Sequence, residues 1–243
     1  MPGESVEHFL ELLKGSPPGA VFNPWWQVDK ENDVGPRAPR IRREQLRDYL
    51  AKRLGQTQFA LIGEALGYRG GHFTGIPMTS ERILLGRNKD VRIEANLLFS
   101  DIAPRRTSKP QKCRAGFSEP TATIVWNTLL QLGLSPEQFV LWNAFPWHSF
   151  NRHRGMLSNR MPTKPERSVG LPVLKAFLNL FPCDEVVALG RIAARQLADL
   201  SVEPHYVRHP ASGGAKLFRQ QIAKMVEKID SAKSHSLRAV GRY

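Results

Sequence analysis

Residues 58–63 read Gln-Phe-Ala-Leu-Ile-Gly, a short apolar run that ends at a glycine and is typical of a buried strand. Strands that alternate with helices indicate parallel βα units, so we expect an α/β fold. Specifically, we expect a three-layer α/β/α sandwich whose central parallel sheet has about four strands. Three further runs predict strands, at 139–143, 185–190 and 205–208. Helical patterns lie at about 121–132, 171–181, 192–200 and 216–229.

The rest of the chain flanks this unit. We expect residues 1–55 to form N-terminal helices and a Pro/Gly-rich loop that pack on the core, including a basic helix at about 43–54 that ends at Gly55. Residues 56–230 then form the α/β domain. Residues 231–243 form a basic C-terminal tail, and their sequence leaves disorder and contact with DNA both open.

The composition points to a polyanionic partner. The 243 residues include 35 Lys and Arg against 22 Asp and Glu, a formal net charge of +13. Such an excess favours nucleic acid, less often an acidic membrane surface, and the alternative is a basic surface with no partner. Two cysteines exclude a disulfide framework and a four-thiolate metal site. No run is long and apolar enough to span a membrane, so we expect a soluble cytoplasmic protein without a membrane partner.

Unusual residues follow the predicted strands, where open parallel sheets bind their ligands. Five glycines occur between Gly63 and Gly75, in an order that fits neither a phosphate-binding P-loop nor a dinucleotide fingerprint. Asn143 ends the second strand, and its amide offers a donor and an acceptor to a planar ring. The fourth strand runs into His209-Pro-Ala-Ser-Gly-Gly214. The alternatives are turn glycines, a turn before Pro146 and a structural histidine.

Together, in this order and spacing, the segments resemble the uracil-DNA glycosylase superfamily over roughly residues 57–226. Gly63-Glu-Ala-Leu-Gly67 is similar to the GEAPG form of its first motif, with Leu66 where Pro is usual. Asn143 matches the uracil-reading Asn, and Asn159-Arg-Met-Pro-Thr163 resembles a segment downstream of it. His209-Pro-Ala-Ser resembles the His-Pro-Ser motif and the loop that wedges into the duplex. The resemblance implies that family's α/β/α fold.

The resemblance also implies a function in DNA base-excision repair. A monofunctional hydrolase of this family flips deoxyuridine out of DNA, cleaves its N-glycosidic bond, releases uracil and leaves an abasic site. The implied partner is uracil-containing DNA, with uracil as product, and the protein is a monomer without a metal or other cofactor. The implied catalytic residues are Glu81, Glu64 and His209; the substrate-binding residues are Gly63, Ala65, Leu66, Gly67, Tyr68, Phe73, Met78 and Asn143; the DNA-binding residues are Arg152, Arg154, Arg160, Ser212, Gly213, Gly214 and Lys216.

Three departures from the family bear on the site. Ala65 stands where some branches have Asp or Asn, so the carboxylate comes from elsewhere. We favour Glu81, which aligns with a carboxylate proposed as catalytic in one branch, over Glu64; a salt bridge or a helix-start charge is the alternative for either. Met78 stands where a Phe normally stacks on the base, and Phe73 or Tyr68 is the alternative.

The two cysteines cannot replace the four that hold an iron–sulfur cluster in branches with the GEAPG form, so we expect no cluster. Two other functions remain open at this point. One is a glycosylase for another deaminated base, hypoxanthine or xanthine. The other is a non-catalytic module that binds nucleic acid.

Overall fold

The computed structural model describes residues 5–240, with side chains from residue 5 to residue 229. Its centre is a four-stranded sheet in the order β3-β2-β5-β6, and all three strand pairs are parallel. The predicted parallel sheet is therefore confirmed. The strands are β2 (Phe59–Ala65), β3 (Phe139–Phe145), β5 (Glu185–Leu189) and β6 (His205–Val207).

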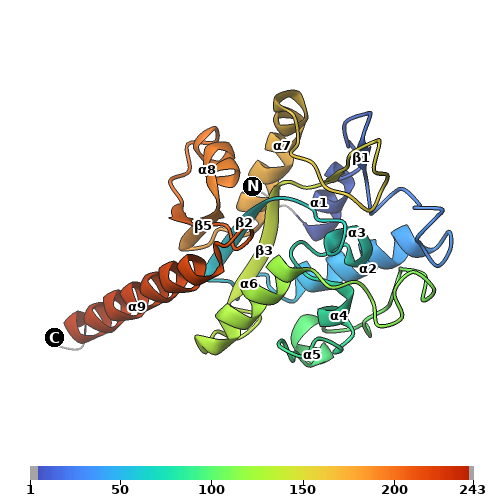
Figure 1. Ribbon diagram of the computed structural model, residues 1–243. Coiled ribbons are helices and arrows are strands. Elements are labelled where there is room, and N and C mark those ends of the chain that lie inside the picture. Colours follow the sequence, from blue (N-terminus) through green and yellow to red (C-terminus); the bar gives the residue numbers. More distant parts are fainter. Residues whose placement is uncertain (1–4, 241–243) are drawn as a thin grey trace.

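Helices cover both faces of the sheet, which makes the three layers (Figure 1). In the sheet, β3 lies on one side of β2, whereas β5 and β6 lie on the other side. Because crossovers between parallel strands are right-handed, this change of direction places the connecting helices on opposite faces of the sheet. α7 packs on β3 and α8 on β5, while α6 and α9 pack against each other on the other side. The bounds are α6 (Pro120–Gln131), α7 (Lys164–Leu180), α8 (Arg191–Ala198) and α9 (Ala215–Val240).

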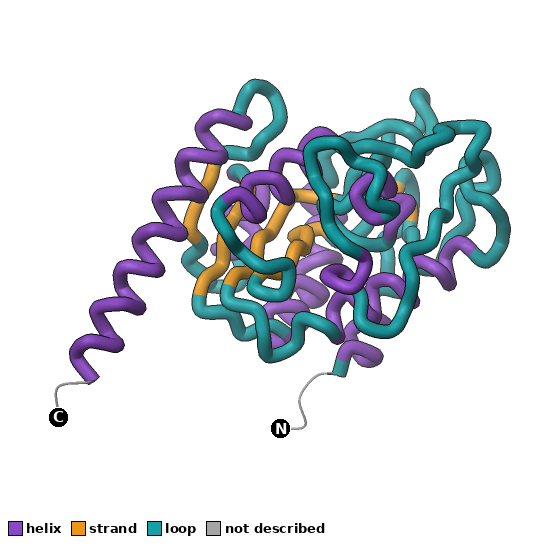
Figure 2. The backbone as a smooth tube through the Cα atoms, turned by 90° about the horizontal axis from the view of Figure 1, so that it is seen from below, coloured by secondary structure: helices purple, strands orange, loops and turns teal. Residues whose placement is uncertain are grey.

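Two helices are longer than the sequence patterns indicate. α7 begins at Lys164 rather than near 171, because Thr163 and Glu166 form a capping box there and Pro165 suits the first turn. Pro172 lies inside the helix and conceals this continuity in the sequence. α9 continues past Ile229 to Val240 and projects beyond the sheet (Figures 1 and 2). Residues 231–240 of the basic tail are thus helical, and residues 241–243 lie outside the described part.

The N-terminal segment covers the free edge of β3. Its helices are α1 (Val6–Leu12) and α2 (Ala38–Ala51), and α2 ends at Ala51, with Lys52 as its C-cap, rather than at Gly55. The backbone amide of Leu141 in β3 donates to the Tyr49 hydroxyl at 3.0 Å, and Arg53 Nε donates to the Phe139 carbonyl at 3.1 Å. These bonds satisfy edge groups that would otherwise be open to pairing with another strand.

Short elements surround the glycine-rich segment that follows β2. They are the antiparallel pair β1 (Val21–Phe22) and β4 (His148–Ser149), and the helices α3 (Gly71–Thr74), α4 (Glu81–Leu84) and α5 (Ala95–Leu98). Of these elements, the sequence analysis indicates only the start of α4, as the helix-start alternative for Glu81. Trp25 is fully buried, and its indole N–H donates to the Gly75 carbonyl at 3.1 Å. This bond ties the N-terminal loop to the end of α3.

A buried chain of polar side chains fixes α3 from the other side. His72 Nε2 lies 3.1 Å from Asp29 Oδ2, and His72 Nδ1 lies 2.9 Å from His148 Nδ1. His148 Nε2 in turn lies 2.8 Å from the Ser158 carbonyl oxygen. Because buried polar groups need partners, this network holds the loops after β2 and β3 in one arrangement.

Among the described helices, none has the length and apolar character needed to cross a membrane.

Candidate active site at the strand ends

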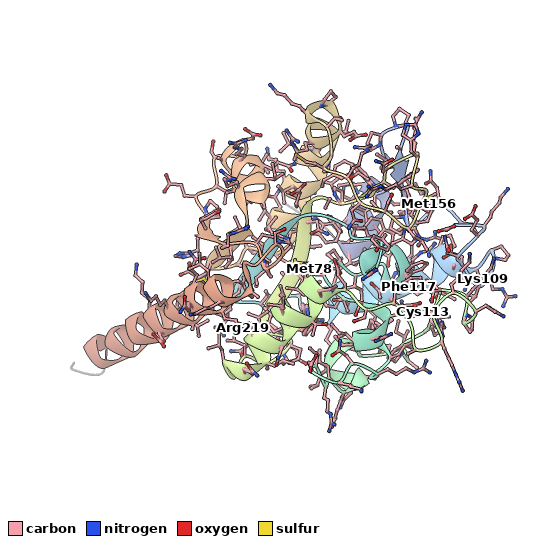
Figure 3. The ribbon with its side chains drawn as sticks, in the orientation of Figure 1. Met78, Lys109, Cys113, Phe117, Met156 and Arg219 are labelled. Carbon is pink, nitrogen blue, oxygen red and sulfur yellow. The ribbon has the colours of Figure 1, made fainter. Side chains whose placement is uncertain are left out.

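Gly63 and Asn143 are paired neighbours on β2 and β3, so the two sequence motifs meet at one point. A Cβ on Gly63 would lie 2.5 Å from an atom of the Asn143 amide and 3.3 Å from Met78 Sδ. Any side chain at position 63 would therefore displace Asn143 or Met78, which is why glycine is required here. Met78 lies beside β3 in this cluster (Figure 3).

The Asn143 amide is buried and held by backbone on both sides. In the orientation that satisfies both ends, Nδ2 donates to the Trp142 carbonyl and Oδ1 accepts from the Leu66 amide, each at 3.3 Å. Asn143 is 1% exposed, and Met78 lies next to its strand neighbour Gly63. Because this residue is shielded from solvent, a planar ligand can contact the amide only when the surrounding residues move.

Glu64 and His209 come together in a hollow of about 320 Å³ beyond the end of β2, which we call the Glu64–His209 hollow. Its wall combines the first motif, the segment after Ser158 and His209, which lies two residues after β6. It is lined by Glu64, Ala65, Leu66, Gly67, Asn159, Arg160, Met161 and His209.

A second hollow of about 520 Å³, the arginine hollow, shares Glu64, Met161 and His209 with the first. It adds Gly190 and three guanidinium groups, those of Arg191, Arg195 and Arg208. A continuous concave surface with several cations suits a ligand that carries phosphates.

The position of Glu64 perturbs its acid strength. Burial raises the pKa of Glu64 above its usual range, and the positive charge of Arg167 offsets part of this rise. The side chain is half-buried and faces both hollows. A carboxyl group in such a place can act on a bound substrate as a charge or as a proton acceptor.

His209 is held as a neutral donor. Its Nδ1 accepts a hydrogen bond from the Ala211 amide at 3.1 Å, so the proton of the neutral ring lies on Nε2. Burial lowers the pKa of His209, and the nearby charge of Arg208 lowers it further. His209 therefore presents an N–H group, rather than a lone pair, for ligand binding.

Glu81 has a different setting from the one the sequence analysis favours. It is fully buried and lines neither hollow. Its Oε1 accepts from the amides of Thr107 and Ser108, both at 2.9 Å, and its Oε2 accepts from the Ser108 hydroxyl and, at 3.4 Å, from the Phe117 amide. Glu81 thus anchors the segment 104–117, on which Phe117 and Cys113 lie (Figure 3).

The two alternative aromatics also lie apart from the Glu64–His209 hollow. Phe73 is fully buried and stacks on Phe117 with ring centroids 4.5 Å apart. Tyr68 is half-buried beside Gly67, and its amide donates to Asn159 Oδ1 at 3.0 Å. Of the three candidates for base stacking, only Met78 contacts the Gly63–Asn143 pair.

Some of the expected DNA-binding side chains are exposed to solvent, whereas Arg160 is bonded to other residues of the fold. Arg152, Arg154 and Lys216 are exposed. Arg160 is engaged within the fold, since its guanidinium binds both oxygens of Glu166 at 2.6 and 2.7 Å and also the Ala20 carbonyl. It lines the Glu64–His209 hollow but has little freedom to follow a phosphate backbone.

The loop after β6 has a compact tip. Ser212 (φ +53°) and Gly213 (φ +78°) turn the chain back toward α9, and Gly214 is buried against the His209 carbonyl. Ser212 is exposed and lines the arginine hollow. The geometry leaves a small, polar tip beside His209.

Several functional candidates do not stand out in the sequence. Asn159 lies within a quoted motif, but its bond to the Tyr68 amide depends on tertiary structure. Met161 is 59% exposed at the junction of the two hollows, an unusual place for an apolar side chain. Glu119 lies 55 residues beyond Glu64 in the chain, yet its carboxyl group contacts Gly67.

Within the described residues, no three His, Cys, Asp or Glu side chains gather as a metal-binding cluster. Cys113 and Cys183 are both free thiols.

Comparison with known proteins gives the family. The chain matches the family model described as the Uracil DNA glycosylase superfamily over residues 54–228. Its fold is similar to the crystal structure of wild-type SMUG2 from Pedobacter heparinus, with a TM-score of 0.59 and 12% sequence identity, covering 93% of this chain and 98% of that one. No curated protein matches the sequence. Since the family model spans most of the chain, and includes every strand of the sheet and the site, this protein belongs to the uracil-DNA glycosylase superfamily of DNA glycosylases.

Proposed function

We propose that this chain hydrolyses the N-glycosidic bond of deoxyuridine in DNA, so that uracil is released and an abasic site remains. The observation that carries this proposal is the meeting of Glu64 and His209 in one hollow, directly beyond the paired Gly63 and Asn143. A buried base-reading amide, an N–H donor and a carboxyl group are the three kinds of group that this reaction needs.

Base selection falls to Asn143. A glycosylase takes its target nucleotide out of the stack and reads the edge of the base in a tight pocket. The amide donates to a carbonyl oxygen and accepts from a ring N–H, which is the pattern of uracil, whereas the amino group of cytosine presents a donor in the wrong place. Met78 supplies an apolar, adaptable surface next to this amide.

Bond cleavage leaves negative charge on the departing base. As the C1′–N1 bond breaks, its electron pair moves onto the pyrimidine, and preorganised donors stabilise that developing anion. His209 lines the hollow and carries its proton on Nε2. The amide of Gly67 lies between those of Leu66 and Tyr68, which already donate to Asn143 and Asn159. We assign anion stabilisation to His209 and this loop.

The sugar develops positive charge in the same step. A carboxylate beside C1′ balances that charge and aligns the water that attacks it. Glu64 takes this role in our proposal, since it shares the hollow with His209, whereas the four donors around Glu81 already occupy its oxygens.

A base-release assay tests the function. Duplexes that carry uracil, hypoxanthine, xanthine or a normal mismatch are incubated with the protein, and released base and alkali-sensitive abasic sites are both measured. Release from the uracil duplex alone supports the proposal. Release from hypoxanthine or xanthine without uracil shows a glycosylase of another specificity, and DNA binding without release from any duplex shows a non-catalytic module.

The acid limb of the pH–rate profile is expected to depend on two groups. The rate rises with pH because Glu64 must be ionised, and its raised pKa places this limb above the range of an ordinary Glu. Protonation of His209 at Nδ1 also removes the acceptor of the Ala211 amide. In single-turnover assays, the slope of log rate against pH therefore approaches two for wild type and one for Glu64→Gln.

The exposed Glu203 supplies the matched control for this profile, so Glu203→Gln should keep the wild-type slope. A Glu64→Gln variant with the wild-type rate and slope would show that the carboxylate is elsewhere.

A further inference from the structure

Glu119 turns its side chain away from the helix that it precedes. It occupies the position just before α6, where a carboxylate commonly accepts hydrogen bonds from the first helical amides. No such bond forms. The carboxyl group points instead at the first motif, where a Cβ on Gly67 would lie 2.5 Å from Oε1 and a Cβ on Gly70 would lie 2.0 Å from Oε2. The two glycines therefore make room for this carboxyl group.

The carboxyl group of Glu119 lacks a partner in the described part of the chain. Its Oε2 is shielded from solvent and has no hydrogen bond. An ionised carboxylate in such a place loses its hydration without compensation, so the neutral acid is favoured. Burial accordingly raises the pKa of Glu119 to about 7. A neutral carboxylic acid carries one O–H group that it can donate.

Glu119 lines a hollow of about 450 Å³, the Glu119 hollow, which opens between the first motif and the loop after β6. Tyr68 and Arg69 line one side, α6 lines another, and Pro210, Ala211 and Ser212 line the third. Arg69 is the other charged side chain of this lining and Tyr68 the other titratable one. The described lining thus contains one cation and the tip of the loop after β6, and Glu119 is its only carboxylate.

We propose that Glu119 donates a hydrogen bond, as a neutral acid, to a phosphate oxygen of the DNA strand that carries the target nucleotide, with Arg69 beside it as the cation. This inference rests on the proposed function, because it requires that the loop 209–214 face the DNA duplex. Phosphate fits the hollow because it is the acceptor-rich group that lies next to any flipped nucleotide. Ionisation of Glu119 replaces this attraction with repulsion between two anions.

The test measures DNA affinity against pH. The probe is a labelled duplex with a tetrahydrofuran abasic analogue, and its Kd is measured by fluorescence anisotropy from pH 6.5 to 8.5. Over this range the neutral share of an acid with a pKa of about 7 falls from about three quarters to a few per cent. We expect the wild-type Kd to rise about tenfold, and the Kd of Glu119→Gln, whose amide still donates, to change less than twofold. The exposed Glu203→Gln is the control that keeps the wild-type dependence.

A second measurement leaves the protein unaltered. The phosphates around the abasic analogue are replaced, one at a time, by neutral methylphosphonates. At one position the pH dependence of wild-type binding should disappear. Equal pH dependence in wild type and Glu119→Gln, or pH dependence that survives every replacement, overturns the proposal. Because the probe contains no base at the target position, these results do not depend on whether uracil is the base released.

Discussion

His209→Ala is expected to slow uracil release by about 10²–10³-fold, which is the usual cost of removing one preorganised donor to a developing anion. His209 lines the Glu64–His209 hollow, and its proton lies on Nε2 because Nδ1 accepts from the Ala211 amide. Alanine leaves the hollow open and offers no donor in its place. Single-turnover rates on a uracil duplex measure this loss directly, and the Kd for the abasic duplex should change less than threefold.

His205→Ala is the matched control for this variant. His205 is exposed on β6 and pairs with Glu185, away from the hollow. Its removal should leave the rate within twofold of wild type. A His209→Ala rate within threefold of wild type would exclude His209 from anion stabilisation.

Glu81→Ala is expected to lower the free energy of unfolding by about 3 kcal/mol or more, because the amides of Thr107, Ser108 and Phe117 lose their shared acceptor. For a chain of this length, such a loss lowers Tm by roughly 6–12 °C. Calorimetry or thermal circular dichroism measures it. The segment 104–117 should also become more accessible to proteases, since Glu81 accepts hydrogen bonds from three of its backbone amides.

Comparison with Glu64→Ala separates the structural from the chemical role. Glu64 is half-buried and makes no such set of backbone contacts, so its removal should leave Tm within about 2 °C while the rate falls. The reverse pattern, in which Glu81→Ala keeps its Tm and loses its activity, would make Glu81 the catalytic carboxylate.

The parallel sheet was predictable because short apolar runs alternate with helical patterns along the chain. Gly63 and Asn143 belong together because parallel strands bring their carboxyl ends to one edge. The strand ends therefore indicated the candidate site, and the ordered set of motifs indicated the family.

The choice between the two glutamates could not be made in the same way. Glu81 is occupied by amides of residues 107 and 108, and no local pattern predicts that a loop 26 residues away will fold onto it. Glu119 carried no signal at all, because its only distinctive property is the absence of a partner. The start of α7 was concealed by Pro172, which interrupts the helical pattern without ending the helix.

The hydrogen bond between the Ala211 amide and His209 Nδ1 couples the conformation of the loop to the position of the proton on the ring. Ala211 belongs to the loop that, in our proposal, meets the duplex, and its amide also decides which nitrogen of the imidazole carries the proton. When the loop keeps its compact turn, the ring is ready to donate. DNA that distorts the loop frees Nδ1, and the neutral ring can then carry its proton on the nitrogen that faces away from the base. In our proposal, the chemical step therefore depends on the fit of the loop to the duplex, and a poorly seated site is not cleaved.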